Sequence, residues 1–270
     1  MYADLALTVA VYLISQSPNK LLVDTTGLDV ANVRVDNPLI AQSNETSHLF
    51  RMSATADWSS NAISMRIFSV DLTGKRTVSH ARVEVRVVPG QRWLAEWKRN
   101  THLITARIDA LAAAVHDPNS ETHLVKRGMA YKLFAAIVQY KTEYQGMSEI
   151  ILDSHRLEAV STVEFQVGKE EFYLNPRWID SLGGIAGFIM NANDGVGSRD
   201  QVFVNHGWER MRIAEPLQQN RTYRAYNRMQ LVENTTYAGD TYILYDGRIV
   251  AIFEGVTVCF VLSSPVIEIY

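Results

Sequence analysis

Residues 178–194 read WIDSLGGIAGFIMNAND, and residues 2–13 read YADLALTVAVYL. Up to Met190 and Leu13 the two runs are apolar on nearly every side apart from one aspartate near the start, Asp180 in the later run and Asp4 in the earlier one. Such runs predict helices that are almost completely buried. Four candidate strands follow each helix. The predicted elements are a helix over 3–13 with strands over 29–35, 49–57, 62–71 and 77–88, and a helix over 178–191 with strands over 201–213, 222–232, 241–245 and 249–260.

This repetition of one helix and four strands decides the fold class. The strand over 77–88 alternates strictly, with valines on one face and charged residues on the other, as expected for a sheet with one wetted face. Thr73-Gly74 and Asp246-Gly247 mark a turn between the last two strands of each half, and the second pair is the stronger hairpin signal. We therefore predict an α+β double hotdog, in which two antiparallel sheets each wrap around a central helix. A coincidental likeness between the halves of an irregular α+β protein is the open alternative.

The same pattern gives the domain organisation. Residues 1–90 form the first hotdog, residues 91–125 a connecting helix (91–115) and linker, and residues 126–270 the second hotdog. The second half also has a helix over 129–140 and strands over 147–152 and 158–167 before its central helix. The first half has no counterpart of the strand over 158–167 or of the loop after it. Either the first hotdog is built without them, or the chain starts inside a domain.

Composition narrows the classes of function. The chain has 270 residues, of which 47% are hydrophobic and 20% charged, with a net charge of -3, which is typical of a soluble globular protein and argues against a nucleic-acid partner. The apolar run over 5–14 has no preceding Lys or Arg and is too short to span a bilayer, so we expect neither a signal peptide nor a membrane anchor, and a cytoplasmic location. The motifs of phosphate-binding loops, zinc hydrolases and serine hydrolases are absent, so we predict no metal site.

Asp180 is the candidate for chemistry. An acid at the head of a helix has a structural explanation as an N-cap, and a functional one as half of an acid/base pair whose proton affinity is tuned by burial. Gly183, Gly184 and Gly187 oppose helix formation, which suggests close approach of another backbone or a ligand. The polar residues that would surround an apolar cavity here are Asn191, Asn193, Asn205 and His206, of which His206 is more typical of a structural role.

Six blocks in order extend this interpretation to a family. They are 2–13 (YADLALTVAVYL), 93–100 (WLAEWKRN), 126–140 (KRGMAYKLFAAIVQY), 178–194 (WIDSLGGIAGFIMNAND), 201–213 (QVFVNHGWERMRI) and 237–244 (YAGDTYIL). Together they resemble the product template domain of fungal non-reducing iterative polyketide synthases, a dehydratase-like double hotdog. The resemblance covers nearly the whole chain.

The resemblance implies an activity and its partners. Such domains take a linear poly-β-keto chain on the phosphopantetheine arm of an acyl carrier protein and direct its aldol closures, with no cofactor of their own. We therefore expect an acyl carrier protein, the other polyketide synthase domains and the polyketide substrate as partners, with a homodimer as one open arrangement. A His/Asp dyad does the chemistry, because an imidazole oriented by a carboxylate can remove an acidic methylene proton.

Carried over by position, the resemblance implies site residues. Asp180 matches the family aspartate, Asn191 and Asn205 match polar residues expected to line the pocket, and Gly184 and Phe188 are assigned to the same substrate pocket. Gly184 stands where relatives often carry His or Gln. The family histidine precedes the helix over 3–13 and has no counterpart here, which predicts a chain truncated at its N-terminus.

Three functions follow as hypotheses. The first is a polyketide cyclase that is impaired because the histidine segment is absent. The alternatives are a catalytically inactive hotdog that binds acyl chains or acts as a scaffold, and a dehydratase of β-hydroxyacyl thioesters.

Overall fold

The structure is a computed structural model that describes residues 1–17, 27–38, 49–135, 138–168, 171–195, 201–262 and 267–269. Its helices are α1 (Tyr2–Ser15), α2 (Gln91–Lys98), α3 (Thr101–Ala114), α4 (Arg127–Phe134), the 3₁₀ turn η2 (Thr142–Tyr144) and α5 (Pro176–Asn191). Its strands are β1 (Gly27–Val35), β2 (Phe50–Asp57), β3 (Ala62–Val70), β4 (Arg76–Val88), β5 (Thr122–Lys126), β6 (Val138–Tyr140), β7 (Met147–Asp153), β8 (Glu158–Glu164), β9 (Gln201–Ile213), β10 (Thr222–Arg228), β11 (Gln230–Glu233), β12 (Thr236–Tyr245), β13 (Arg248–Leu262) and β14 (Ile267–Ile269).

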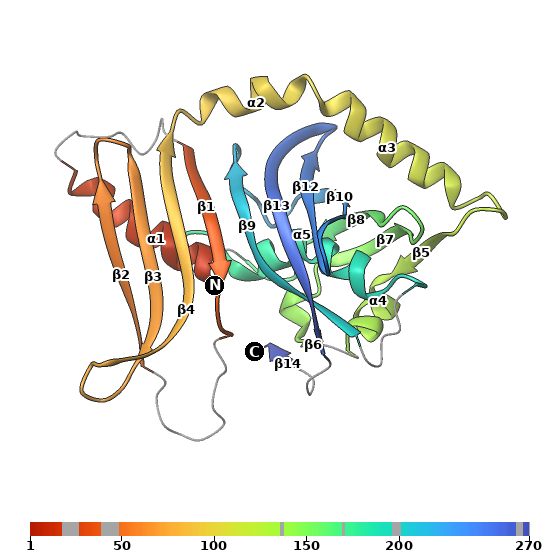
Figure 1. Cartoon of the computed structure of the whole chain (residues 1–270). Coiled ribbons are helices and arrows are strands. Elements are labelled where there is room, and N and C mark those ends of the chain that lie inside the picture. Colours follow the sequence, from red (N-terminus) through yellow and green to blue (C-terminus); the bar gives the residue numbers. More distant parts are fainter. Residues whose placement is uncertain are drawn as a thin grey trace.

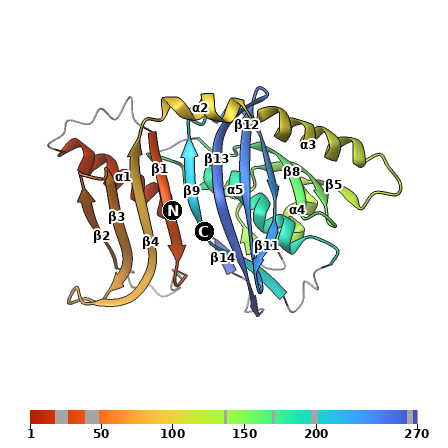
Figure 2. The same cartoon turned by 45° about the horizontal axis from the view of Figure 1, so that its top comes forward.

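One large sheet runs through both halves (Figures 1 and 2). Within the described part of the chain its order is β2-β3-β4-β1-β9-β13-β12-β10-β8-β7-β5, with β11 attached to β12. The halves meet where β1 pairs antiparallel with β9, for example at Val30 and Met211. On either side of this seam the strands follow in equivalent order, β1-β4-β3-β2 and β9-β13-β12-β10, which confirms the repeated double hotdog pattern.

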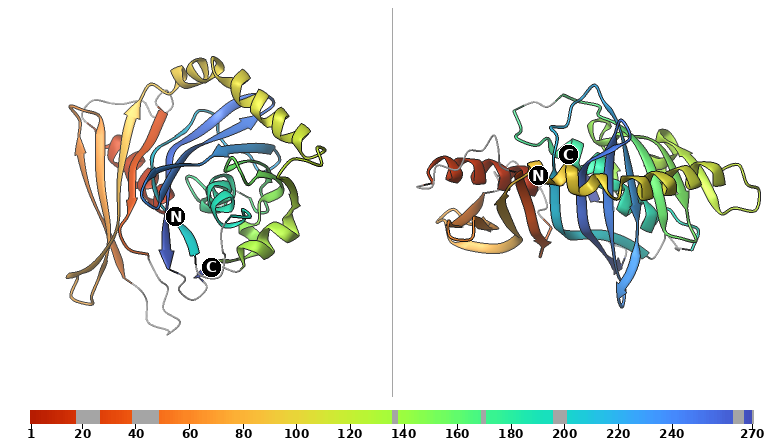
Figure 3. Two further views of the ribbon diagram at one scale, coloured as in Figure 1. Left: turned by 45° about the vertical axis from the view of Figure 1, so that its right-hand side comes forward. Right: turned by 90° about the horizontal axis from the view of Figure 1, so that it is seen from above.

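Helices α1 and α5 occupy the inner face of the sheet, each against the strands of its own half (Figure 3). Both are apolar nearly all round, so each contributes buried residues to one large core, among them Ala6, Ala10, Leu182 and Ile185. Burial of this kind stabilises by about 25 cal/mol per Å² of apolar surface. The two central helices predicted from sequence are therefore confirmed as the centres of the two halves.

Helices α2 and α3 cross the outer face of the sheet and join the halves (Figure 1). A second, smaller core holds them there: it includes Trp93 and Trp97 of α2 and Ile108 and Leu111 of α3, packed on apolar residues of the second half. Buried Glu158 of β8 also accepts two hydrogen bonds from Arg107 of α3.

Four predicted elements were wrong in extent, and one of them, the strand over 241–245, begins earlier at Thr236. The single helix over 91–115 is two helices, because the chain breaks at Asn100 and α3 restarts there, each helix then lying on its own part of the curved sheet. The helix over 129–140 ends at Phe134, and 138–140 form strand β6, which pairs in parallel with β14, while residues 136 and 137 lie outside the described residues. The strand over 222–232 is divided into β10 and β11.

The boundaries at residues 90 and 125 stay predictions. Strand β5 begins before the second boundary, at Thr122, and pairs with β7 of the second half. None of the described helices is both long and apolar enough to cross a membrane.

Candidate functional site

Asp180 lies one turn inside α5 and does not cap it. The cap is Asn175, whose side-chain oxygen accepts a hydrogen bond from the backbone N–H of Arg177 at 2.9 Å, and Pro176 occupies the first helical position. Both residues are typical of a helix start. The structural explanation of Asp180 as an N-cap is therefore wrong.

Asp4, the counterpart of Asp180 in the first half, has a structural role. A side-chain oxygen of Asp4 in α1 accepts a hydrogen bond from the backbone N–H of Leu174 at 2.9 Å, which ties α1 to the loop before α5. Asp180 makes no hydrogen bond or ion pair with any described residue. A carboxyl group without partners inside a protein calls for a functional explanation.

The surroundings of Asp180 change its acidity. Asp180 is partly exposed, and burial of its carboxyl group raises the pKa from 3.8 to about 6. The positive charge of the Met1 amino group acts in the opposite direction and offsets part of the rise. At neutral pH the group can therefore change its protonation state readily, as acid/base chemistry requires.

Three tyrosines from three elements lie close enough to this carboxyl group to feel its charge: Tyr131 of α4, Tyr140 of β6 and Tyr144 of η2. Burial raises the pKa of each phenol, and the negative charge of Asp180 raises it further. The Tyr140 ring packs at 5.7 Å from that of Tyr131 and 6.4 Å from that of Tyr144, measured between ring centroids. All three phenols therefore stay protonated at neutral pH and remain hydrogen-bond donors.

The hydroxyl groups differ in what they already bind. Tyr131 Oη accepts from the backbone N–H of Met147 at 3.1 Å and donates to the carbonyl of Tyr144 at 3.2 Å, so it holds the turn in place. Tyr140 Oη has no hydrogen-bond partner among the described residues. Tyr140 is therefore a phenol near Asp180 that is free to donate to a ligand.

A close contact fixes this turn against α5. Ser181, next to Asp180, donates from Oγ to the carbonyls of Arg177 at 2.8 Å and Tyr144 at 3.2 Å. Gly146 allows the approach, because a Cβ there would lie 2.5 Å from Ser181 Oγ. No site role was predicted from the sequence for this turn or for the three tyrosines. Their occurrence within fourteen residues, 131–144, was the available signal.

The predicted pocket residues have different surroundings. Asn191 uses its amide on the backbone, donating to the carbonyls of Gly187 and Phe203 and accepting from the N–H of Phe203. Asn205 is exposed and accepts from the N–H of Gly207 at 2.7 Å. Both asparagines therefore have structural bonds, and their contact with a substrate stays a prediction.

Phe188 is enclosed by other side chains and packs edge-on against Phe134 at 5.5 Å, so contact with a substrate would require side-chain movement. Gly184 is partly exposed, and a Cβ there would lie 3.7 Å from the terminal methyl of Met147. Their assignment to the substrate pocket stays a prediction.

The expected close approach of a backbone to the α5 glycines is wrong. Among the described residues, a Cβ at Gly183 or Gly187 would meet only side-chain atoms, at 3.6 and 3.9 Å, as at Gly184. These are ordinary van der Waals distances.

No histidine is among the described groups that act on Asp180. His206 of β9 lines a groove on the outer face of the sheet, and His80 lies buried with its Nε2 at 2.6 Å from Ser69 Oγ. The residues that the structure describes include no group of three His, Cys, Asp or Glu side chains that could hold a metal ion.

Comparison with known proteins identifies the class. Residues 108–261 match the family described as polyketide synthase dehydratase N-terminal domain. The dehydratase domain of PpsC from Mycobacterium tuberculosis superposes with a TM-score of 0.69 at 13% identity, over 97% of this chain and 83% of that chain. The dehydratase domain of RzxB from Pseudomonas fluorescens gives 0.66 at 12% identity, over 91% and 80%. The chain is a dehydratase-like double hotdog of the polyketide synthases.

Curated relatives narrow the family. The chain is 71% identical over 256 residues to the non-reducing polyketide synthase phnA of Penicillium herquei, and 43% identical over 256 residues to the conidial yellow pigment biosynthesis polyketide synthase of Emericella nidulans. Each match covers 95% of this chain and 12% of the relative, so the chain spans about an eighth of their length. The chain belongs to the product template domains of fungal non-reducing polyketide synthases.

Proposed function

We propose that the chain directs the cyclisation of a linear poly-β-keto chain, presented as a thioester on an acyl carrier protein, by intramolecular aldol addition and aromatising loss of water. The observation that carries the proposal is Asp180, a carboxyl group with no partner among the described residues and with a pKa of about 6. Perturbed acidity together with unused bonding capacity is typical of a reacting site.

The chemistry begins at a methylene between two carbonyls. Loss of one of its protons to a base gives an enolate, whose carbon attacks a ketone carbonyl further along the same chain. A carbon–carbon bond forms and the ketone oxygen takes up a proton to become a hydroxyl group. This hydroxyl group and a hydrogen on the neighbouring carbon then leave together as water, which gives a carbon–carbon double bond. Proximity and orientation in a shaped pocket select which carbon attacks which carbonyl.

Asp180 and Tyr140 have distinct roles in this proposal. The Asp180 carboxylate orients the base and stabilises the positive charge that the base acquires, as the aspartate of a dyad does. The Tyr140 hydroxyl donates to the substrate oxygen on which negative charge develops. Because burial and the charge of Asp180 keep the pKa of Tyr140 high, the donor proton is retained at neutral pH.

None of the described histidines is among the groups that act on Asp180, so no described imidazole completes the dyad. Loss of a general base lowers the rate by about a hundredfold to ten-thousandfold. We therefore expect the chain as given to bind its substrate and to turn it over slowly.

The test compares the chain with a form extended at its N-terminus by the corresponding segment of the Penicillium herquei synthase, using a poly-β-keto thioester as substrate. We expect the extended form to cyclise faster by about a hundredfold or more, and Asp180→Asn in that form to remove most of the gain. Asp109→Asn, at an exposed carboxyl of α3, is the matched control and should keep the activity. Full cyclisation by the extended Asp180→Asn variant would contradict the proposal.

A second candidate is dehydration of β-hydroxyacyl thioesters, which the superposition on dehydratase domains favours. Mass spectrometry of the product separates the two reactions, because dehydration alone gives an enoyl chain without a new ring. A non-catalytic scaffold would leave every product unchanged on substitution of Asp180.

A further inference from the structure

Strand β6, which carries Tyr140, stands apart from the large sheet (Figure 1). Among the described residues its strand partner is β14, and the two form a separate two-stranded sheet. The pairing is parallel and places Ile267 opposite Val138 and Ile269 opposite Tyr140. A segment from the far end of the chain therefore pairs with the backbone of the residue that is proposed to donate to the substrate.

Hydrogen bonds also fix the turn that follows Tyr140. The carbonyl of Tyr140 accepts from the side-chain Nε2 of Gln145 at 2.8 Å, which closes this turn. The carbonyl of Tyr144 in the same turn accepts from Tyr131 Oη and from Ser181 Oγ, each at 3.2 Å, so the turn is tied to both α4 and α5. The backbone of Tyr140 is thus held by an anchored turn and by β14.

The ring of Tyr140 has neighbours of its own. It packs edge-on against the rings of Phe134 at 5.3 Å and Tyr131 at 5.7 Å, measured between centroids. Tyr140 also lies close enough to Asp180 to feel its charge. Because the ring is attached to the backbone of β6, a shift of this strand would move the hydroxyl relative to Asp180.

We infer that β14 is a positioning element for the hydroxyl of Tyr140, because its pairing with β6 fixes the backbone that carries this donor. Reacting groups on strands are held more precisely than those on loops. Even two paired strands are only marginally stable by themselves, so β6 is not expected to keep its geometry without β14. A misplacement of about 1 Å at a reacting site can lower a rate about a hundredfold. The inference rests on the proposed function, in which Tyr140 donates to the substrate oxygen.

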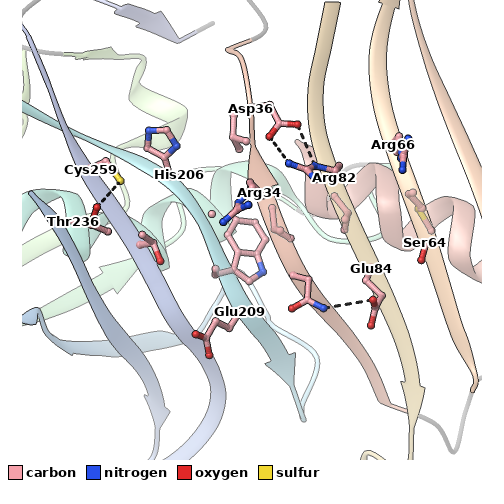
Figure 4. Close-up of a pocket in the computed structure, with 18 of the residues that line it drawn as sticks. Arg34, Asp36, Ser64, Arg66, Arg82, Glu84, His206, Glu209, Thr236 and Cys259 are labelled. Carbon is pink, nitrogen blue, oxygen red and sulfur yellow. Dashed lines mark hydrogen bonds and ion pairs between the residues drawn. The ribbon is translucent and has the colours of Figure 1, made fainter. Parts of the chain in front are cut away.

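The groove on the outer face of the sheet provides a control position outside this arrangement (Figure 4). It has a volume of about 1180 Å³, and Ser64 of β3 is one of the residues that line it. Neither Asp180 nor Tyr140 is among its described lining residues. Ser64 is exposed, so removal of its hydroxyl is a suitable control for removal of the Tyr140 hydroxyl.

The test uses the chain extended at its N-terminus, as in the test of the proposed function, with a poly-β-keto thioester as substrate. The shortened variant ends at Leu262 and lacks β14, and the matched control ends at Ile269 and keeps it. We expect kcat of the shortened variant to fall by at least about tenfold, whereas KM should change by less than about threefold. The control should keep both constants within about twofold of the parent.

A double-mutant cycle separates positioning from a general structural effect. Tyr140→Phe removes the hydroxyl, so removal of β14 should have almost no further effect on kcat in that background, whereas in the Ser64→Ala background it should keep its full effect. Ile267→Gly/Ile269→Gly weakens the strand without shortening the chain and should lower kcat in the same way. Full additivity of the deletion and Tyr140→Phe, or a rise in kcat on deletion, would overturn the inference.

Hydrogen exchange followed by mass spectrometry tests the pairing without the reaction. The backbone amides of β6 should exchange faster in the shortened variant than in the control, because a paired strand protects them. Unchanged exchange would overturn the inference whatever the activity, and so would faster exchange with an unchanged kcat. If the extended parent does not cyclise, or if Tyr140→Phe cyclises as fast as its parent, the proposed function fails at that point. The exchange result alone then decides whether β14 fixes the backbone of Tyr140.

Discussion

Replacement of Asp180 by Asn should make the protein more stable above neutral pH. In the unfolded chain the carboxyl group has its ordinary pKa of 3.8, and in the folded chain burial raises the pKa to about 6. The folded state therefore binds the proton more tightly than the unfolded state does. As pH rises from 4 through 6, ionisation of Asp180 removes stability from the folded state, and above this window the loss is constant.

The size of the effect follows from the shift. A difference of about two pKa units is worth about 3 kcal/mol at pH 8, and roughly half of that at pH 5. Asn has the same shape and no charge, so Asp180→Asn should raise the free energy of unfolding by up to about 3 kcal/mol at pH 8. For a domain of this size that corresponds to a rise in Tm of about 6–10 °C.

Urea unfolding followed by circular dichroism at pH 4, 5 and 8 measures the difference between the parent chain and the variant. The difference in free energy of unfolding between variant and parent should be small at pH 4 and should increase up to pH 8. The control Asp109→Asn removes one exposed carboxylate from α3 and should give a small gap at each pH. A gap for Asp180→Asn that is the same at pH 4 and pH 8, or a variant less stable than its parent at pH 8, would refute the claim that burial destabilises this carboxylate.

Three other predictions concern the surroundings of Asp180. Tyr140→Phe keeps the ring and removes the free hydroxyl, so we expect kcat for cyclisation to fall by about a hundredfold with a nearly unchanged Tm; an unchanged kcat would exclude the hydroxyl as a donor in the reaction. Asn175→Ala removes the cap of α5 and the hydrogen bond to the Gly168 carbonyl, and should lower the free energy of unfolding by about 1–2 kcal/mol or more in urea titrations. Asn175→Ser can replace the cap but not the bond to Gly168, so it should restore only part of the loss. Gly146→Ala places a methyl group 2.5 Å from Ser181 Oγ and should destabilise by about 1–3 kcal/mol. The control is Gly128→Ala in α4, where a Cβ would have no atom within 4 Å, and it should be neutral or stabilising by up to about 1 kcal/mol. An equal loss of unfolding free energy in these two variants would contradict the close contact at Gly146.

The sequence was informative wherever a periodic pattern was long. The two central helices and most strands were predicted to within a few residues, because their apolar patterns extend over seven or more positions. The sequence was less informative where one helix or strand ends and the next begins. The interruption at Asn100 and the change from helix to strand before Val138 were missed, because both depend on what the segment packs against and not on its own pattern.

Some features of the candidate site could likewise be predicted from the sequence, and others could not. The sequence by itself determined the repeated fold, the family resemblance and the choice of Asp180, since these depend on residue types and their order along the chain. Only the tertiary structure decided that Asn175 and not Asp180 caps the helix, that Tyr140 lies near the carboxyl group, and that β14 pairs with the strand that carries Tyr140. The cap is local, but the other two arrangements join residues far apart in sequence. They depend on burial and strand register, which exist only once the sheet has closed around its helices.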